Sequence, residues 1–182
     1  MNKLPKLPES KTKIRFQDCD PFNHLNNAAY INYFNNARED HLVENYGIDI
    51  YEMARKEGKS WVTGSNQIAY LRPAFLMEEV IIDSRLIKYN DTQIDIELRM
   101  LNATKTEVKA IMWSTFDHFN LIQQKREVHS EELLKLFKKV KKPVVEKQFE
   151  ERIAVFKRQR LSLIHISEHT RLVHSSRMPS SA

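Results

Sequence analysis

Residues 15–40 decide the fold of this chain, and they read RFQDCDPFNHLNNAAYINYFNNARED. The alternation just before and into this stretch predicts a strand over residues 11–16, with Ile14 and Phe16 on one face. Asp, Pro and Asn in residues 18–23 then supply the chemistry of a turn. A long helix is expected to follow and to end around residues 45–47, where Gly47 can serve as its C-terminal cap. Its apolar residues recur near helical spacing at Ala28, Ile31, Phe34, Ala37 and Leu42.

The remainder of the chain changes from helical to strand periodicity. A short helix is expected over residues 50–57, with a stop at Gly58. Strands are expected at residues 60–71, 80–89, 93–101 and 107–119, followed by helices at 131–140 and, after Pro143, at 146–160. One long helix followed by consecutive strands predicts an α+β fold, an antiparallel sheet wrapped around one long central helix. The absence of strand–helix alternation argues against a doubly wound nucleotide-binding fold.

Composition is that of an ordinary globular protein. Hydrophobic residues make up 41% of the 182 residues and charged residues 29%. Cys19 is the only cysteine, which excludes an intramolecular disulfide and a multi-cysteine metal site. Residues 1–13 hold lysine and proline but no long apolar run, so we expect neither a signal peptide nor a transmembrane segment, and a cytoplasmic protein.

The net charge of +5 is concentrated near the C-terminal end of the chain. Residues 135–160 hold ten Lys and Arg against three Asp and Glu. Such a basic segment can contact nucleic acid, anionic lipid or the phosphates of a cofactor. A solvated helix face is the interpretation we prefer, so no nucleic-acid partner is expected.

Three parts are therefore expected in the chain. Residues 1–142 form the main domain and residues 143–160 a basic C-terminal helix. Residues 161–182 contain no Lys, Asp, Gly or aromatic residue, a sharp change in composition. We interpret them as a non-native or read-through extension, with a natural disordered tail as the alternative.

Polar side chains cluster where the first strand hands over to the long helix. A helix N-terminus presents unsatisfied backbone N–H groups and a partial positive charge. Such an end can stabilise the oxyanion that forms when a carbonyl is attacked. A carboxylate a few residues upstream, such as Asp18 or Asp20, can act as base or nucleophile. Together these are the parts that hydrolysis of an acyl group needs.

The stretch DCDPFNHLNNAAYINYFNNAR resembles the signature D-x-D-x-x-G-H-x-N-N-x-x-Y-x-x-x-F-E-x-A-R of the 4-hydroxybenzoyl-CoA thioesterase-like hotdog proteins. The resemblance extends over residues 11–140, including YLRPAF at residues 70–75. It implies an acyl-CoA thioesterase, or one acting on acyl carrier protein, with no cofactor beyond the coenzyme A of its substrate. It also implies a homodimer, often paired into a homotetramer, with sites at the interface where the partner contributes from the strand at residues 61–70.

The resemblance also assigns site residues. The second Asp of D-x-D is the catalytic carboxylate of that family and corresponds to Asp20. His24 and Asn27 match the motif's H and second N, and we take them as catalytic candidates. Tyr30, which matches the Y, joins Asp18 and Arg72 as substrate-binding candidates.

Each assignment has a structural alternative. Asp18 and Asp20 are also good helix-entry caps, the role we prefer for Asp18. His24 suits a buried hydrogen-bonded histidine, Tyr30 packing against the helix, and Arg72 a loop charge. Cys19 lacks a neighbouring base and is interpreted as an inert residue of the strand.

Two positions depart from the signature. Asn23 stands where the motif has Gly, and Asn tolerates the left-handed backbone better than most residues, so the turn is expected to survive. Asn35 stands where the motif has Glu and removes a helix carboxylate. Asp20 would then carry the chemistry alone.

Other functions remain open. The two departures favour a non-catalytic acyl-binding hotdog protein, whereas a hotdog hydratase or dehydratase would need a different His–acid pairing. The D-x-D pair also suggests a magnesium-dependent phosphotransferase, but that needs alternating strands and helices and a glycine-rich phosphate loop. The chain has only three glycines, so we expect no metal.

Overall fold

The structure of the protein is a computed structural model, and it describes residues 3–158. It divides into two compact units, residues 1–145 and the residues from 146 onward, which are described separately. The interpretation of residues 161–182 as an extension or tail lies outside the described residues.

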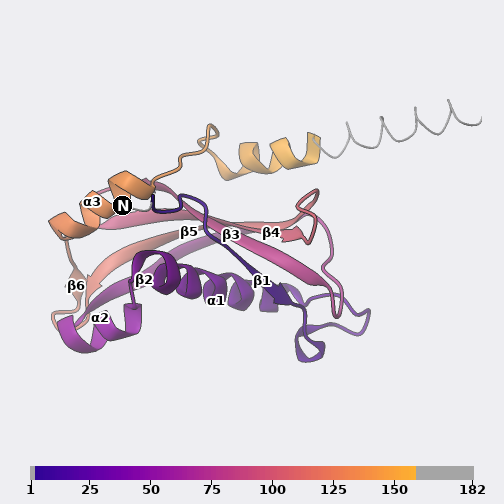
Figure 1. The fold of residues 1–182 in the computed structure, drawn as a ribbon, viewed down its shortest axis with the longest axis horizontal. Helices are drawn as coiled ribbons and strands as arrows, with labels where there is room; N and C mark the ends of the chain where they lie inside the picture. Colours follow the sequence, from indigo (N-terminus) through magenta and orange to yellow (C-terminus); the bar gives the residue numbers. More distant parts are fainter. Residues whose placement is uncertain (1–2, 159–182) are drawn as a thin grey trace, which may run out of the picture. The chain divides into compact units, whose positions relative to one another are not determined.

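The first unit is an antiparallel sheet with a long helix along one face (Figure 1). In chain order its elements are β1 (Glu9–Lys13), η1 (Phe16–Asp18), α1 (Asn27–Tyr46), α2 (Ile50–Glu57), β2 (Lys59–Tyr70), β3 (Glu79–Tyr89), β4 (Gln93–Asn102), β5 (Val108–Asn120), β6 (Lys125–Arg126) and α3 (Glu131–Val140). The sheet order is β1-β3-β4-β5-β2, and the short β6 pairs with β5. The predicted α+β arrangement of an antiparallel sheet around one long helix is confirmed.

Local side-chain chemistry sets the helix ends. The Asn26 side chain accepts a hydrogen bond from the backbone N–H of Ala28 and so caps the start of α1. Gly47 ends α1 with a φ of 67°, in the left-handed region where glycine is at no disadvantage. Asp49 caps α2, which ends at Gly58, also at positive φ. A side chain at Gly58 would also clash with Ile122, so both the backbone conformation and the available space favour glycine here.

The core lies between α1 and the facing side of the sheet. Its fully buried members come from β3, β4 and β5 and from the buried face of α1, with the segments that flank them: Ile14, Leu25, Tyr30, Phe34, Ala37, Ala74, Val80, Ile82, Leu98, Met100, Ala110 and Met112. Of the five residues expected to mark the buried face of α1, only Phe34 and Ala37 are fully buried. The true face also includes Arg38 and His41, which a search for apolar spacing does not find.

The first strand differs from its prediction. β1 ends at Lys13, and Phe16 lies in η1 with 78% of its surface exposed. Pairing stops at Ile14, which exchanges backbone hydrogen bonds with Glu78 and Met77. The chain then turns, with the amide of Asp18 donating to the carbonyl of Arg15. The prediction that Ile14 and Phe16 share one face of a strand is therefore wrong. Both residues lie beyond the end of β1, and Ile14 is buried whereas Phe16 is on the surface.

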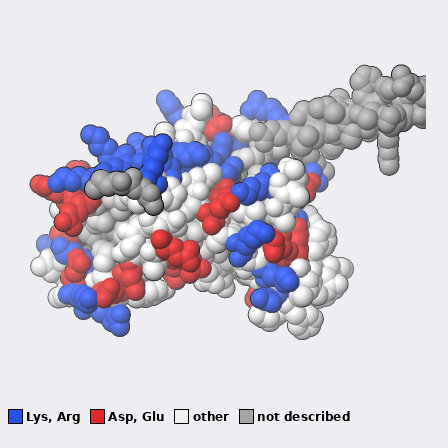
Figure 2. Space-filling model, in the orientation of Figure 1, with Lys and Arg blue, Asp and Glu red and all other residues white. Residues whose placement is uncertain are grey.

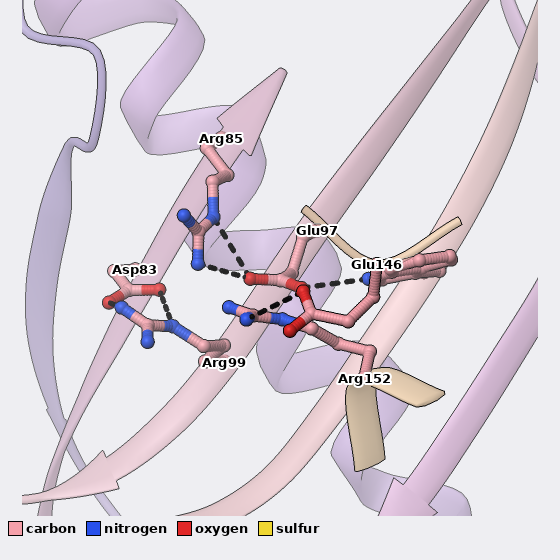
Figure 3. Close-up of polar contacts among 7 residues, drawn as sticks. Asp83, Arg85, Glu97, Arg99, Glu146 and Arg152 are labelled. Carbon is pink, nitrogen blue, oxygen red and sulfur yellow. Dashed lines mark hydrogen bonds and ion pairs between the residues drawn. The ribbon is translucent and has the colours of Figure 1, made fainter. Parts of the chain in front are cut away.

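The opposite side of β3 and β4 carries cross-strand ion pairs (Figure 3). The register sets Asp83 opposite Arg99, whose Nε lies 3.0 Å from Asp83 Oδ1. Arg85 stands opposite Glu97 in the same way and bonds its carboxylate, with Nε 2.9 Å from Oε1. Glu97 also accepts a hydrogen bond of 2.8 Å from the indole N–H of Trp113 on β5. Opposite charges facing each other across strands help to fix the register of this sheet.

Basic residues are concentrated in the part of the chain that comes after the sheet in sequence. Lysine and arginine side chains gather over α3, where Lys138 and Lys139 occupy the last turn and favour the negative end of the helix dipole (Figure 2). In the second unit, residues 149–158 are helical, within the range expected for the basic helix. There Arg152 pairs with Glu146 at 3.2 Å (Figure 3). Within residues 3–158 no helix is long and apolar enough to cross a membrane, and the cytoplasmic location stays a prediction.

Candidate active site

Asp20 organises the loop between η1 and α1. Its Oδ1 accepts hydrogen bonds from the backbone N–H groups of Phe22 (2.8 Å) and His24 (2.9 Å). The backbone closes the same loop, since the amide of Asp20 donates to the carbonyl of His24 at 2.7 Å. The second carboxylate oxygen, Oδ2, lies 4.0 Å from Nδ1 of His24, with the Asp20 side chain 31% exposed. The loop thus holds Oδ1 through two hydrogen bonds, whereas Oδ2 accepts no hydrogen bond from the described residues and can react.

Asn23 gives this loop its tight turn. Its φ of 61° is left-handed, the conformation for which the family signature has glycine. The expectation that the turn survives with Asn is confirmed. The loop is also fastened to the segment after β2, because the Asn23 carbonyl accepts from the amide of Leu76, and the amide of Leu25 donates to the carbonyl of Ala74.

The start of α1 leaves one backbone donor free. The Asn26 side chain takes the amide of Ala28, and the Asn26 carbonyl takes the amide of Ala29. Among the described residues, none accepts a hydrogen bond from the amide of Asn27, the first residue of α1. A free N–H at the positive end of a 20-residue helix is suited to hold a developing negative charge.

Asp20 and the start of α1 face the same cleft. This cleft has a volume of about 500 Å³. It is lined by residues of the Asp20 loop, the first turn of α1 and the chain after β2: Asp20, His24, Leu25, Asn26, Asn27, Tyr30, Tyr70, Leu71, Arg72 and Pro73. A positioned carboxylate and a free amide in one open cleft can together activate a nucleophile and stabilise an oxyanion.

Tyr30 and Tyr70 form an aromatic wall of this cleft. Tyr30 is buried, and its hydroxyl accepts a hydrogen bond of 3.2 Å from the amide of Ala74. Burial raises the pKa of Tyr30, which keeps its hydroxyl protonated. The Tyr70 ring meets the Tyr30 ring edge-on at 5.0 Å. Sequence reasoning did not single out Tyr70, although it lies in the YLRPAF segment.

Asp18 is engaged in the fold. Its Oδ2 accepts a hydrogen bond of 2.8 Å from the hydroxyl of Tyr33, and that hydroxyl accepts in turn from the amide of Arg15 at 3.1 Å. Asp18 does not line the cleft that holds Asp20. Asp18 is therefore bound within the fold, but not as the helix-entry cap expected for it, because Asn26 caps α1. Burial, followed by the bond to Asp18, raises the pKa of Tyr33.

His24 and Arg72 both line the cleft. The His24 ring is half-exposed and meets Phe75 edge-on at 5.1 Å, so it is not the buried histidine of the structural alternative. Arg72 lines the cleft and also pairs with Glu107 at 3.5 Å, with both side chains well exposed. Exposed pairs of this kind contribute little to stability, so Arg72 can exchange Glu107 for another anion.

The sequence model of the thioesterase-like superfamily matches residues 14–153. The chain belongs to this superfamily. The match covers the Asp20 loop, α1 and the whole sheet from β2 to β6. It confirms the resemblance noted from residues 18–38. None of the curated protein sequences matches this thioesterase-like chain.

Solved structures share the fold. A DHNA-CoA thioesterase from Staphylococcus aureus is 16% identical, with 74% of this chain and 90% of that chain covered and a TM-score of 0.67. YbaW, a probable thioesterase from Escherichia coli, is 28% identical, with 73% and 98% covered and a TM-score of 0.63. A hypothetical protein from S. aureus, SAV2348, solved in complex with CoA, is 12% identical, with 82% and 94% covered and a TM-score of 0.70. The expected hotdog fold is confirmed.

Two further candidates in this thioesterase-like protein are the thiol of Cys19 and a metal site. Cys19 lies in the loop after η1 rather than in a strand, and its thiol donates to the carbonyl of Arg15. Burial, and then the charges of Asp18 and Asp20, raise the pKa of Cys19 and disfavour the thiolate. Within residues 3–158 no three His, Cys, Asp or Glu side chains converge as a metal site requires. That the protein needs no metal stays a prediction.

Proposed function

We propose that the protein hydrolyses an acyl-CoA thioester in the cleft that holds Asp20, giving a free acid and a thiol. One observation carries the proposal: Asp20 and Asn27, whose amide has no acceptor among the described residues, line the same cleft. Hydrolysis of a thioester needs a group that activates or replaces water, and donors that hold the carbonyl oxygen as it becomes negative. Membership of the thioesterase-like superfamily supports the same reaction class.

In this reaction Asp20 has one of two roles. As a general base, its Oδ2 takes a proton from water while the water oxygen attacks the thioester carbon. As a nucleophile, Oδ2 attacks the carbon itself, and water then opens the resulting anhydride. In either case the Asn27 amide holds the oxyanion, the carbon–sulfur bond breaks, and the thiolate leaves and is protonated. The two hydrogen bonds to Oδ1 orient the carboxylate for this step.

The remaining cleft residues are assigned to binding. His24, 4.0 Å from Asp20 Oδ2, positions the carboxylate and the water. Tyr30 and Tyr70 present an apolar wall to the acyl group. Arg72 is placed to meet a phosphate of coenzyme A. Coenzyme A is the carrier we favour because SAV2348, a structural relative, was solved with CoA bound. Acyl carrier protein is the alternative carrier, and no separate cofactor is proposed.

The proposed active form is a homodimer, with a tetramer as a further level of assembly. β2 is an outermost strand of the sheet, and residues 62–67 along it are all exposed. An exposed edge of this length is a liability that pairing with a second copy removes. Strand β2 ends at Tyr70, which lines the cleft, so a partner paired to β2 would lie beside the site.

A non-catalytic acyl-binding protein is the second candidate. Asn35 favours it, because this half-buried position of α1 carries an amide where the signature has a carboxylate. The turn at Asn23 gives it no support, since that turn keeps its left-handed backbone. The two candidates share the cleft and differ only in whether the bound thioester is broken.

A thiol-release assay with aliphatic and aromatic acyl-CoAs tests the proposal. We expect turnover of at least one acyl-CoA by the wild type and a loss of at least ~100-fold in kcat for Asp20→Asn. Asp40→Asn, the same change at an exposed site on α1, serves as the matched control and should keep full activity. Binding of acyl-CoA by isothermal titration calorimetry without release of thiol would replace hydrolysis by the acyl-binding function. Equal turnover by Asp20→Asn and wild type would remove Asp20 from the mechanism.

A further inference from the structure

Arg38 carries an unneutralised charge in the interior of the first unit. Its side chain lies on the buried face of α1, and the residue is only 7% exposed. The guanidinium stacks on the ring of Phe116, with Cζ 3.8 Å from the ring centroid. Within the described residues no acceptor bonds the buried Nη2 of Arg38, and no carboxylate pairs with this side chain. An unsatisfied buried donor of a charged group costs free energy, so its retention calls for a partner.

The charge remains at neutral pH. Burial lowers the pKa of Arg38 to about 10, which still leaves the guanidinium protonated near pH 7. The adjacent carboxylate, Glu39, is bonded by the hydroxyl of Tyr51 at 2.9 Å. No carboxylate of the described chain is therefore placed to neutralise Arg38 through a hydrogen bond.

Arg38 lines a cavity of about 50 Å³ between α1, the sheet and α3. The walls are largely apolar, with Leu42, Ile94, Ile96, Leu136 and Phe137 among them. The other polar groups at the cavity already have partners. His41 bonds Ser84 at 2.8 Å and Ser10 at 3.2 Å, and Arg85 bonds Glu97. Among the polar groups described at this cavity, Arg38 is thus the one whose side chain still has an unused hydrogen-bond donor.

The combination of a free guanidinium and an apolar pocket defines a ligand. A guanidinium recognises a carboxylate through paired N–H···O bonds. The volume of about 50 Å³ is small, so a carboxylate that enters the cavity can carry only a short hydrocarbon portion. We propose that this cavity is a binding site for a short-chain aliphatic carboxylate, with the carboxylate on Arg38 and the carbon chain toward Leu136 and Ile96.

This site is separate from the proposed active site. The two cavities share no lining residue, and Arg38 lies about three turns beyond Asn27 along α1. The inference therefore does not rest on the proposed function, and binding is expected even in a variant that does not hydrolyse thioesters.

Thermal unfolding and isothermal titration calorimetry of the full chain with propionate test the site. We expect propionate to raise Tm saturably, as a ligand of the folded state does. Propionamide, the neutral analogue, and sodium chloride at equal ionic strength should not. Arg38→Gln should weaken propionate binding at least about tenfold, the order expected when a charge-assisted hydrogen bond is lost. Arg55→Gln, at an exposed position of α2, is the matched control and should bind as the wild type does.

A second variant guards against misfolding at the buried position. Leu136→Phe keeps Arg38 and fills the cavity from the half-buried face of α3, so it should also abolish the propionate effect. The proposal fails if wild type shows no saturable shift with propionate, or if Leu136→Phe retains it. An equal shift with chloride would also overturn the assignment of a carboxylate ligand.

Discussion

The hydroxyl of Tyr70 donates a hydrogen bond of 3.0 Å to the main-chain carbonyl of Asn27. This bond joins the last residue of the edge strand β2 to the first residue of the central helix α1. It therefore holds the carbonyl of Asn27, the residue whose own amide is the proposed oxyanion donor. The Tyr70 hydroxyl touches no proposed reacting atom, but it helps to position the residue that supplies the oxyanion donor.

Tyr70→Phe should lower hydrolysis more than it lowers stability. The ring and its edge-on contact with Tyr30 remain, and only one partly exposed hydrogen bond is lost, worth about 0.5–1.5 kcal/mol. We expect kcat to fall by roughly threefold to tenfold as the amide of Asn27 becomes less well held, with KM little changed. Steady-state kinetics together with a melting curve check this. A rise in KM alone would mean that the Tyr70 hydroxyl contacts substrate rather than holding Asn27.

Tyr33→Phe should do the opposite. Tyr33 connects Asp18 to the amide of Arg15, away from the cleft, so its loss is expected to destabilise the fold by about 1 kcal/mol. Urea unfolding measures this change. The activity of the folded enzyme should stay within about twofold of the wild type, because Asp20 and Asn27 keep their contacts. Asp18→Asn should behave likewise, and a selective loss of acyl-CoA binding in that variant would restore Asp18 as a substrate ligand.

A pair of buried histidines makes stability depend on pH. His118 and His129 stack at 4.9 Å beneath Trp61. Nδ1 of His118 faces the carbonyls of Glu127 and Val128, so it carries the proton, and the buried Nε2 has no partner among the described residues. Trp61 donates its indole N–H to Nε2 of His129 at 3.1 Å, which keeps that nitrogen unprotonated. Both rings are therefore held in the neutral form.

Protonation of these rings should weaken the fold. Burial lowers the pKa of His118 and His129 and that of His41. The unfolded chain then binds more protons than the folded one as the pH falls through the ordinary histidine pKa of about 6.5. The free energy of unfolding should therefore be highest above about pH 6.5 and should decrease as the pH falls below that value. Urea unfolding at about pH 7.5 and 5.5 checks this, since unperturbed carboxylates titrate lower still.

His118→Asn provides the control for that pH dependence. Asn retains a donor toward the carbonyl of Glu127 but does not titrate. We expect this variant to be less stable at the higher pH and to lose less stability on going to the lower pH than the wild type does. A wild-type protein equally stable at both values would refute the neutral, buried assignment of these rings.

Oligomerisation can be tested at the edge strand. Val62 lies in the exposed run of β2, and Val62→Lys places a charge where a partner strand would pair. Light scattering at micromolar concentration should give a dimer or tetramer for the wild type and a smaller species for this variant. Val145→Lys makes the same change at a residue that is 93% exposed and should leave the assembly intact. A wild-type monomer would contradict both the assembly and a site shared between copies.

Helix ends were the most predictable part of the fold. α2 runs over residues 50–57 as expected, because Asp49 and Gly58 supply local capping chemistry that needs no distant partner. The strands β2 to β5 were also found to within one residue from their alternation and turns. Phe16 was misplaced because alternation cannot tell whether a strand still has a neighbour to pair with. The two-residue β6 is too short for any periodicity.

The candidate site was only partly predictable. Asp20 and Asn27 stand out because the motif and the helix start coincide in sequence. Tyr33 and Tyr70 were missed because their roles arise from hydrogen bonds between segments far apart in the chain. Arg38 was missed for another reason, since a charged residue on an otherwise apolar helix face reads as surface until the packing is known.

The register of β2 has a consequence for how the chain folds. β2 follows α1 and α2 in the chain, but it pairs with the later strand β5, with Lys59 opposite Asn120 and Tyr70 opposite Ala110. A chain made from its N-terminus, at about 5–20 residues per second, therefore exposes β2 for seconds before its partner strand exists. Pairing between strands so far apart in sequence is slow, because the chain loses the entropy of loop closure before any stabilising contact forms. The bond from Tyr70 to Asn27 can form only when β2 is held against the rest of the sheet. The cleft should therefore be among the last features to mature during synthesis, and a ribosome-bound chain that ends before β5 should lack it.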